Sequence, residues 1–265
     1  MCVHRLENEL FDSVEKRDKI YFISDVHLGA SALNNNKERE RHLVKWLKEI
    51  EPTASELFLV GDIFDFWYEY SAVVPKGFTR FFGQLSHMCD AGIKVKFFTG
   101  NHDVWAFHYL QDEIGVEVYN TPKIFERQGK KLFVGHGDGL NPNDKGYLLL
   151  KKVFTNKVAQ TLFSWIHPDI AFYIANKWSR HSRLSHPDES AHFVANHEKE
   201  EQLQFAMQYL KQEPIDYFIF GHRHVYVNHP LNDTSRLIIL GEWIQTFSYA
   251  LLDKGELTLN KYPMV

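Results

Sequence analysis

The sequence lacks the features that mark several classes of protein. Its 265 residues include only two cysteines, Cys2 and Cys89, and no CxxC pair, which argues against a disulfide framework and fits a reducing compartment. No apolar run reaches the roughly 18 residues of a membrane span, and charges interrupt the N-terminal stretch where a signal peptide would lie. We therefore expect a cytoplasmic protein.

Positive charge is scarce as well. The chain has 30 Lys and Arg against 34 Asp and Glu, a net charge of −4 and a pI near 6.4, which argues against nucleic acid as a partner. Hydrophobic residues make up 44% of the chain, enough to bury one sizeable core. We expect a single domain over residues 1–265 and infer no required protein partner.

Short apolar runs with β-branched or aromatic residues recur along the chain, and each stops at a turn signal. They predict strands at residues 19–24, 57–60, 95–99, 131–134 and 217–220. Residues 38–50 and 78–90 have the apolar spacing of amphipathic helices. Strands that alternate with helices predict βαβ units and a parallel start to the sheet.

The last third of the chain has a different pattern. Short strands predicted at 237–241, 246–252 and 256–260 are separated by turns, which favours antiparallel pairing. We therefore predict an α/β fold in which two mixed sheets form a sandwich flanked by helices.

One segment between two predicted strands differs from the rest in charge. Residues 145–183 are rich in bulky apolar side chains and hold seven Lys and Arg against one acid, so this segment is +6 and the remainder is −10. The pair His167-Pro168 interrupts it near the middle, which predicts a helical hairpin. We predict a helical lid inserted at about residues 145–200.

Polar side chains follow the predicted strands at the ends where an open α/β sheet usually binds its ligand. In extended backbone, residues i and i+2 point the same way, so each DxH or HxH pair is expected to reach one metal. A single histidine in such a loop is more often a packed residue than a ligand. Five such loops would leave several buried charges without partners unless a metal lies among them. The residues are Asp25, His27, Asp62, Asn101, His102, His136, His222 and His224.

The ordered motifs resemble the calcineurin-like metallophosphoesterase superfamily, from about residue 20 to residue 250. More narrowly, DVHLG, GDIFDFW, HGD and the inserted segment are similar to the UDP-2,3-diacylglucosamine hydrolases of lipid A biosynthesis. The resemblance implies a four-layer fold and two adjacent divalent metals. The first metal would be held by Asp25, His27, Asp62 and His224, and the second by Asp62, Asn101, His136 and His222. Manganese is the expected metal, with iron or zinc as alternatives.

The resemblance also implies a chemical role for further residues. Water activated by two metals would attack phosphorus, and His102 would protonate or stabilise the leaving oxygen. Asp65 stands where the superfamily orients this histidine through a carboxylate, whereas we interpret Asp103 as a helix cap. The best-known proteobacterial members of the narrower family have arginine where this chain has His102, which leaves the catalytic class intact and weakens the transfer of substrate.

The substrate implied by the resemblance is UDP-2,3-diacylglucosamine, cleaved to UMP and 2,3-diacylglucosamine 1-phosphate at the cytoplasmic face of the inner membrane. Apolar side chains of residues 148–150, Phe154, Phe163 and Trp165 could line an acyl groove or simply pack. Trp67 and Tyr68 could stack on uracil or pack. The basic residues expected to contact phosphate or lipid head groups are Lys151, Lys152, Arg180 and Arg183. The resemblance also places Asp144 near the substrate and matches Ser182-Arg183 to a Ser-basic pair of the lid.

Two other functions remain open from the sequence. A broader phosphatase, or a nucleotide or cyclic-nucleotide phosphodiesterase, would use the same metal site on soluble substrates. A non-catalytic metal-binding scaffold would be expected to have lost part of the motif set. Because the set is complete here, the sequence favours an enzyme.

Overall fold

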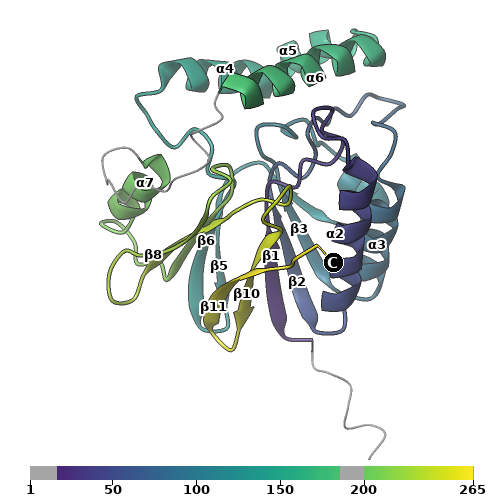
Figure 1. Cartoon of the computed structure of the whole chain (residues 1–265). Helices are drawn as coiled ribbons and strands as arrows, with labels where there is room; N and C mark the ends of the chain where they lie inside the picture. The colour runs from purple at the N-terminus through teal and green to yellow at the C-terminus, as the bar shows by residue number, and fades with distance from the viewer. Residues whose placement is uncertain (1–16, 186–199, 265) are drawn as a thin grey trace, which may run out of the picture.

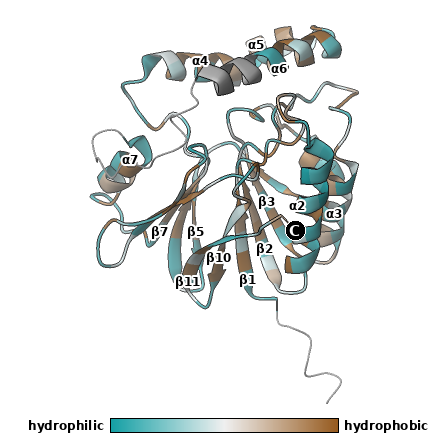
Figure 2. Ribbon diagram, viewed as in Figure 1, coloured by the Kyte–Doolittle hydropathy of each residue, from teal (hydrophilic) through white to brown (hydrophobic). Residues whose placement is uncertain are grey.

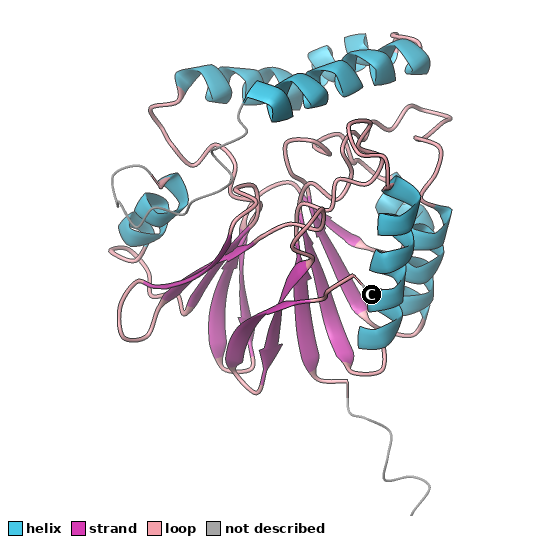
Figure 3. Cartoon of the chain, viewed as in Figure 1, coloured by secondary structure: helices cyan, strands magenta, loops and turns pink. Residues whose placement is uncertain are grey.

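Two β-sheets packed face to face form the centre of the molecule (Figures 1 and 3). The computed structural model describes residues 17–185 and 200–264. The six-stranded sheet has the order β11 (Glu256–Lys261), β10 (Ser248–Asp253), β1 (Lys19–Ile23), β2 (Ala54–Val60), β3 (Lys94–Phe98) and β4 (Glu117–Tyr119). The five-stranded sheet has the order β5 (Lys123–Arg127), β6 (Lys130–Val134), β7 (Tyr217–Phe220), β9 (Arg236–Leu240) and β8 (Tyr226–Pro230).

Both sheets are mixed. In the first, β1, β2, β3 and β4 pair in parallel, and β10 and β11 are added antiparallel at one edge. In the second, β6, β7 and β9 are parallel, while β5 and β8 pair antiparallel at the two edges. The predicted mixed sandwich with a parallel start and antiparallel additions is confirmed.

Helices cover the outer faces of the sandwich and complete four layers. Helices α2 (Asn36–Ile50) and α3 (Thr79–Asp90) pack on the first sheet, and α7 (Glu201–Tyr209) packs on the second (Figure 1). A short π-helix, η1 (Leu110–Ile114), joins β3 to β4.

The central strands are apolar on both sides because both of their faces are buried. In β1, Phe22 faces the core between the sheets and stacks on Phe58 at 4.7 Å, whereas Tyr21 faces the helices and meets Trp46 edge-on at 6.0 Å. Figure 2 shows the brown apolar residues concentrated on the strands. Continuous apolar runs are therefore what this architecture requires.

The inserted segment lies across the end of the sandwich that holds the loops following β1, β2 and β3 (Figure 1). It forms three helices, α4 (Lys145–Thr155), α5 (Lys157–Ser164) and α6 (Pro168–Ser185), which we call the lid. Residues 186–199 of the predicted lid segment lie outside the described residues. In the described chain, none of the helices combines the length and apolar character needed to cross a bilayer.

The predicted two-helix hairpin was wrong in one respect, because the segment has a second break. The break lies at Asn156, whose side chain accepts hydrogen bonds from the backbone N–H groups of Val158 and Ala159 at 2.9 and 3.1 Å. This cap starts a new helix, so Asn156 separates α4 from α5.

Candidate metal centre

The candidate ligands come from both sheets and meet at one end of the sandwich. Asp25 and His27 follow β1, Asp62 follows β2 and Asn101 follows β3, all in the first sheet. The second sheet contributes the loops after β6 and β7, which hold His136, His222 and His224. The site therefore straddles the carboxyl ends of strands in both sheets.

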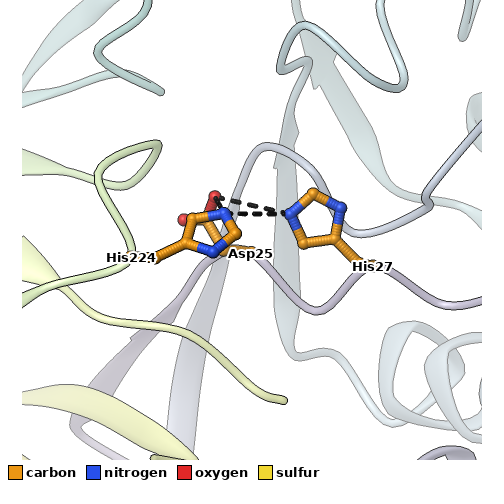
Figure 4. A group of neighbouring side chains, drawn as sticks. All are labelled: Asp25, His27 and His224. Carbon is orange, nitrogen blue, oxygen red and sulfur yellow. Dashed lines mark hydrogen bonds and ion pairs between the residues drawn. The ribbon is translucent and has the colours of Figure 1, made fainter. Parts of the chain in front are cut away.

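One group of donor atoms consists of Asp25, His27 and His224 (Figure 4). The Nε2 atoms of His27 and His224 lie 3.1 Å apart, and Asp25 Oδ1 lies 3.1 Å from His224 Nε2 and 3.8 Å from His27 Nε2. Asp62 also lies near this group, with its Oδ2 3.9 Å from His27 Nε2.

A second group consists of Asp62, His136 and His222. Asp62 Oδ2 lies 3.2 Å from His136 Nε2, and Asn101 Oδ1 lies 3.3 Å from the same nitrogen. The rings of His136 and His222 meet edge-on with centroids 5.2 Å apart. Because Asp62 borders both groups, its carboxylate has the position of a bridging ligand.

The donor set fits two divalent cations. Ligands bound at about 2.0–2.2 Å lie roughly 3 Å from one another around one ion, close to the shortest separations here. Asp25 Oδ1 and His27 Nε2 are each 3.1 Å from His224 Nε2. One oxygen and two imidazole nitrogens gathered at this spacing match the ligand atoms around a single ion. Mixed oxygen and nitrogen donors suit manganese, iron or zinc.

The backbone is left-handed rather than extended at five of the seven candidate ligands. Asp25 has φ 53°, His27 has 47°, Asp62 has 53°, His222 has 69° and His224 has 54°. The expectation that extended alternation would send both members of each pair to one metal was therefore wrong for the second pair. His224 joins the group of Asp25 and His27, whereas His222 joins the group of Asp62 and His136.

Two glycines are required by how closely the loops approach one another. A Cβ at Gly221 would lie 1.8 Å from Ser24 Oγ and 2.5 Å from Asp25 Oδ2. A Cβ at Gly100 would lie 2.2 Å from Asp62 Oδ1. Glycine at both positions lets the backbone approach the two carboxylates that serve as candidate ligands.

Burial and charge adjust the protonation of the ligands. Burial alone would raise the pKa of Asp25 and of Asp62, but the His224 and His136 imidazoles outweigh it, and both pKa values are lowered. Burial lowers the pKa of His27 and of His222 to about 4. The cluster thus offers ionised carboxylates and two neutral imidazoles, which are the forms that bind metals.

The candidate proton donor His102 is oriented mainly by backbone. Its Nδ1 lies 2.8 Å from the carbonyl oxygen of Asp65 and 3.9 Å from the Asp65 carboxylate. That carboxylate lies closer to His27, at 3.2 Å from His27 Nδ1. Asp65 therefore holds His102 through its main chain and His27 through its side chain, a division that the motif alone did not reveal.

The interpretation of Asp103 as a helix cap was wrong, because no helix begins directly after it. Its buried carboxylate instead accepts hydrogen bonds from four backbone N–H groups. The distances are 2.7 Å from Gly100, 3.3 Å from Asp62, 2.8 Å from Ile63 and 3.3 Å from Phe64. Asp103 thus fastens the loop after β2 to the loop after β3 underneath the ligands.

The predicted substrate contacts are spread over the lid. Asp144 caps α4, since its Oδ1 accepts from the Tyr147 N–H at 2.9 Å. Lys151 pairs with Asp138 at 2.6 Å, and Lys152 is exposed. Arg180, Ser182 and Arg183 lie on α6, in the part of that helix whose side chains are not among the described residues.

Aromatic residues join the lid to the loops of the metal centre. Tyr68 donates to the backbone carbonyl of Gln160 at 2.7 Å, and Trp105 Nε1 donates to that of Phe154 at 2.8 Å. Phe163 packs on Trp105 at 4.6 Å between ring centroids. Tyr68 therefore binds the lid, and fully buried Trp67 belongs to the core, so neither is free to stack on a base.

The sequence analysis missed two buried polar residues beside the ligands, Arg39 and Gln202. Arg39 stands on the apolar face of the helix predicted at residues 38–50, together with Leu43, Trp46 and Ile50. A charged residue on such a face is a signal for a buried partner. Gln202 lies on α7, a helix that the apolar pattern did not predict.

Comparison with known proteins gave matches over most of the chain. The family model of the calcineurin-like phosphoesterases matches residues 18–226. A UDP-2,3-diacylglucosamine hydrolase from Porphyromonas gingivalis is 38% identical over 255 residues, covering 92% of this chain and 97% of that protein. A protein of the same name from Histophilus somni is 28% identical, covering 87% and 94%. Among solved structures, a conserved Streptococcus pneumoniae protein described as a predicted phosphoesterase has a TM-score of 0.42 at 14% identity, covering 93% of each chain.

Proposed function

Because the chain belongs to the calcineurin-like phosphoesterase family and is a metal-dependent hydrolase, we propose that its substrate is UDP-2,3-diacylglucosamine. Hydrolysis of the pyrophosphate gives UMP and 2,3-diacylglucosamine 1-phosphate. The observation that carries this proposal is the position of Asp62, which belongs to the group of His136 and His222 and lies 3.9 Å from His27 of the other group, in a chain 38% identical to a hydrolase of that name. The alignment covers 92% of this chain and 97% of that relative.

The ligand assignment follows the two donor groups. Asp25, His27, Asp62 and His224 would hold the first metal, and Asp62, Asn101, His136 and His222 would hold the second, so that Asp62 would be shared by both. When bound, two divalent cations supply positive charge that lowers the pKa of water and neutralises the phosphoryl oxygens. Manganese is our preferred metal, with iron or zinc as alternatives that the same donors accept.

His102 acts on the leaving group. A carbonyl oxygen only accepts hydrogen bonds, so the contact with the Asp65 carbonyl assigns the proton on this side of the ring to Nδ1. Nε2 is then the atom that exchanges a proton with substrate. In the imidazolium form, Nε2–H donates to the oxygen that bridges the two phosphorus atoms as that oxygen leaves with 2,3-diacylglucosamine 1-phosphate.

The lid gives the acylated substrate and the membrane a surface to bind. Large apolar side chains lie exposed on all three lid helices, and lysines lie beside them. A surface of this kind suits acyl chains and anionic head groups, which favours peripheral contact with the cytoplasmic face of the inner membrane. The exposed apolar residues are Leu149, Val153, Val158, Leu162, Trp165, Ile170, Tyr173 and Ile174.

Turnover on three substrates tests the proposal. We expect the manganese-loaded protein to hydrolyse UDP-2,3-diacylglucosamine far faster than UDP-glucose, which shares the pyrophosphate, and faster than bis-p-nitrophenyl phosphate. Equal rates on all three would contradict the assignment of the acylated substrate and would favour a broader phosphodiesterase. No hydrolysis of any phosphate ester by the metal-loaded protein would favour the scaffold.

A further inference from the structure

Arg39 holds the loop that carries the first pair of candidate ligands. It projects from α2, and its side chain is buried with the residue 1% exposed. One terminal nitrogen of its guanidinium donates to the carbonyls of Val26 and His27 at 2.6 and 2.8 Å. These two carbonyls belong to the turn in which Asp25 and His27 adopt left-handed backbone.

Gln202 holds the two loops that carry His136 and His222. It projects from α7 and is also 1% exposed. Its Nε2 donates to the carbonyl of Gly221 at 2.9 Å and to that of Gly137 at 3.4 Å. Gly221 directly precedes His222, and Gly137 directly follows His136.

The glycine at position 137 has a role in this arrangement. A Cβ there would lie 2.3 Å from Gln202 Nε2, so a side chain would displace the amide. Both partners of the Gln202 amide nitrogen are carbonyl oxygens, which fixes the orientation of the amide. Gly137, the glycine of the HGD motif, is thus explained by the close approach of Gln202.

Arg39 and Gln202 reach the site from helices in opposite outer layers of the molecule. Helix α2 covers the first sheet and α7 covers the second (Figure 1). The hydrogen bonds described for Arg39 go to the loop of Asp25 and His27. Those of Gln202 go to the carbonyls directly next to His136 and His222, in two loops of which the second also carries His224.

We propose that Arg39 and Gln202 are positioning residues, each of which sets the affinity of one of the two metal positions. The inference rests on the metal assignment in the proposed function. A ligand in strained backbone stays in place only if its surroundings fix it, and the hydrogen bonds of Arg39 and Gln202 to the loop carbonyls provide that constraint. Outer partners of metal ligands typically contribute about 10- to 100-fold in affinity.

The test compares Arg39→Met and Gln202→Met with matched controls on the same helices. Met keeps the length of each side chain and removes every donor. Arg41→Met on α2 and Gln208→Met on α7 remove exposed side chains of the same type. Manganese affinity is measured by titration with mass-spectrometric metal counting, and anomalous scattering identifies which position is occupied.

Arg39→Met is expected to weaken the position of Asp25, His27 and His224 by about 10- to 100-fold, with a smaller effect on the other position. Gln202→Met is expected to do the reverse, and both controls to match the unmodified protein. Arg39→Lys keeps a donor and should restore part of the affinity. Equal loss at both positions, or no loss, would overturn the proposal.

Folding and the proposed function are checked separately. Circular dichroism of the metal-free variants shows whether each has folded. If a Met variant fails to fold, Arg39→Lys and Gln202→Glu take its place, because Lys keeps fewer donors and Glu offers none to the two carbonyls when ionised. Absence of a metal pair in the unmodified protein would count against the proposed function itself.

Discussion

His224 lies in left-handed backbone with φ 54°, and four other candidate ligands share this conformation. The left-handed conformation costs an L-residue roughly 1–2 kcal/mol of free energy, because Cβ crowds the following carbonyl oxygen. Such strain is common where function fixes the geometry. The metal-free protein therefore holds these residues in place at a cost to its stability.

Replacing His224 by Gly or by Ala tests this strain. Both remove the imidazole, but only Ala keeps a Cβ in the left-handed region. We expect the metal-free Gly variant to be more stable than the Ala variant by about 0.5–1 kcal/mol in urea unfolding. At His87, which lies exposed in α3, the order should reverse because Gly is the poorer helix former. The same order at both positions would contradict the argument.

The division of Asp65 between two histidines makes a second prediction. His102→Ala should lower turnover by at least about 100-fold and leave metal affinity nearly unchanged, because it removes only the proton donor. Asp65→Asn keeps the carbonyl that holds His102 and alters the side chain near His27 Nδ1. It should therefore weaken manganese binding, by about 10-fold or more. The reverse pattern, with metal loss in His102→Ala only, would refute this division of roles.

Protons should compete with the metals at two ligands. Burial tends to lower the pKa of His136 and of His224, but Asp62 and Asp25 outweigh it and raise both pKa values. A raised pKa keeps these imidazoles protonated to higher pH, and only the neutral form binds a metal. Manganese affinity should thus rise as the pH increases through and above the usual histidine range, with protons released on binding. Calorimetry in two buffers of different ionisation enthalpy measures this release, and its absence at neutral pH would contradict the prediction.

At the scale of elements, the lid is where exposed apolar side chains are concentrated. Trp165 is 78% exposed and Leu162 is 55% exposed, and both belong to the α5 end of the lid. Other lid residues, such as Phe163, pack on the loops of the metal centre. The lid thus has one side attached to the catalytic loops and large apolar side chains left in solvent.

Replacing Leu162 and Trp165 together by Ser tests membrane contact. We expect the double variant to bind anionic phospholipid vesicles at least about 10-fold more weakly, because burying each side chain contributes about 1.5–3 kcal/mol. Hydrolysis of bis-p-nitrophenyl phosphate should be unchanged. Met207→Ser, an exposed apolar residue on α7, is the matched control. Unchanged vesicle sedimentation of the double variant would show that Leu162 and Trp165 do not contribute to membrane binding.

Elements with strong patterns were predictable, and those with weak patterns were not. The strand predicted at residues 217–220 has the bounds of β7, because a run buried on both faces is apolar throughout. Strand β5 was missed because KIFER, at a sheet edge, holds only two adjacent apolar residues between charged ones and shows no alternation. The break at Asn156 was missed because an asparagine between two apolar stretches becomes a cap only in its folded context.

The site was likewise only partly predictable from the sequence. The motifs brought the candidate ligands together in prediction, because strand ends in an α/β sheet share one edge. Extended alternation alone gave the wrong grouping of His222 and His224, since the grouping depends on their left-handed φ, whereas the resemblance implied His224 for the first group and His222 for the second. The role of Asp103 was also hidden, because four backbone N–H groups from two loops converge on it only after folding.

At the scale of the whole molecule, the two sheets divide the site between them. The first supplies Asp25, His27, Asp62 and Asn101, and the second supplies His136, His222 and His224. A hydrolase that needs both metals therefore depends on the packing of one sheet against the other. Metals bridging the sheets should in turn stabilise the sandwich, since a ligand that binds only the folded state raises its stability.

The most direct test is the anomalous scattering of a crystal of the manganese-loaded protein, collected on both sides of the manganese absorption edge. The account predicts two peaks about 3.5–4 Å apart. One should lie among Asp25, His27 and His224, the other among Asn101, His136 and His222, with the Asp62 carboxylate between them. A single peak, or two peaks away from these side chains, would contradict the dinuclear centre on which the proposed hydrolysis depends.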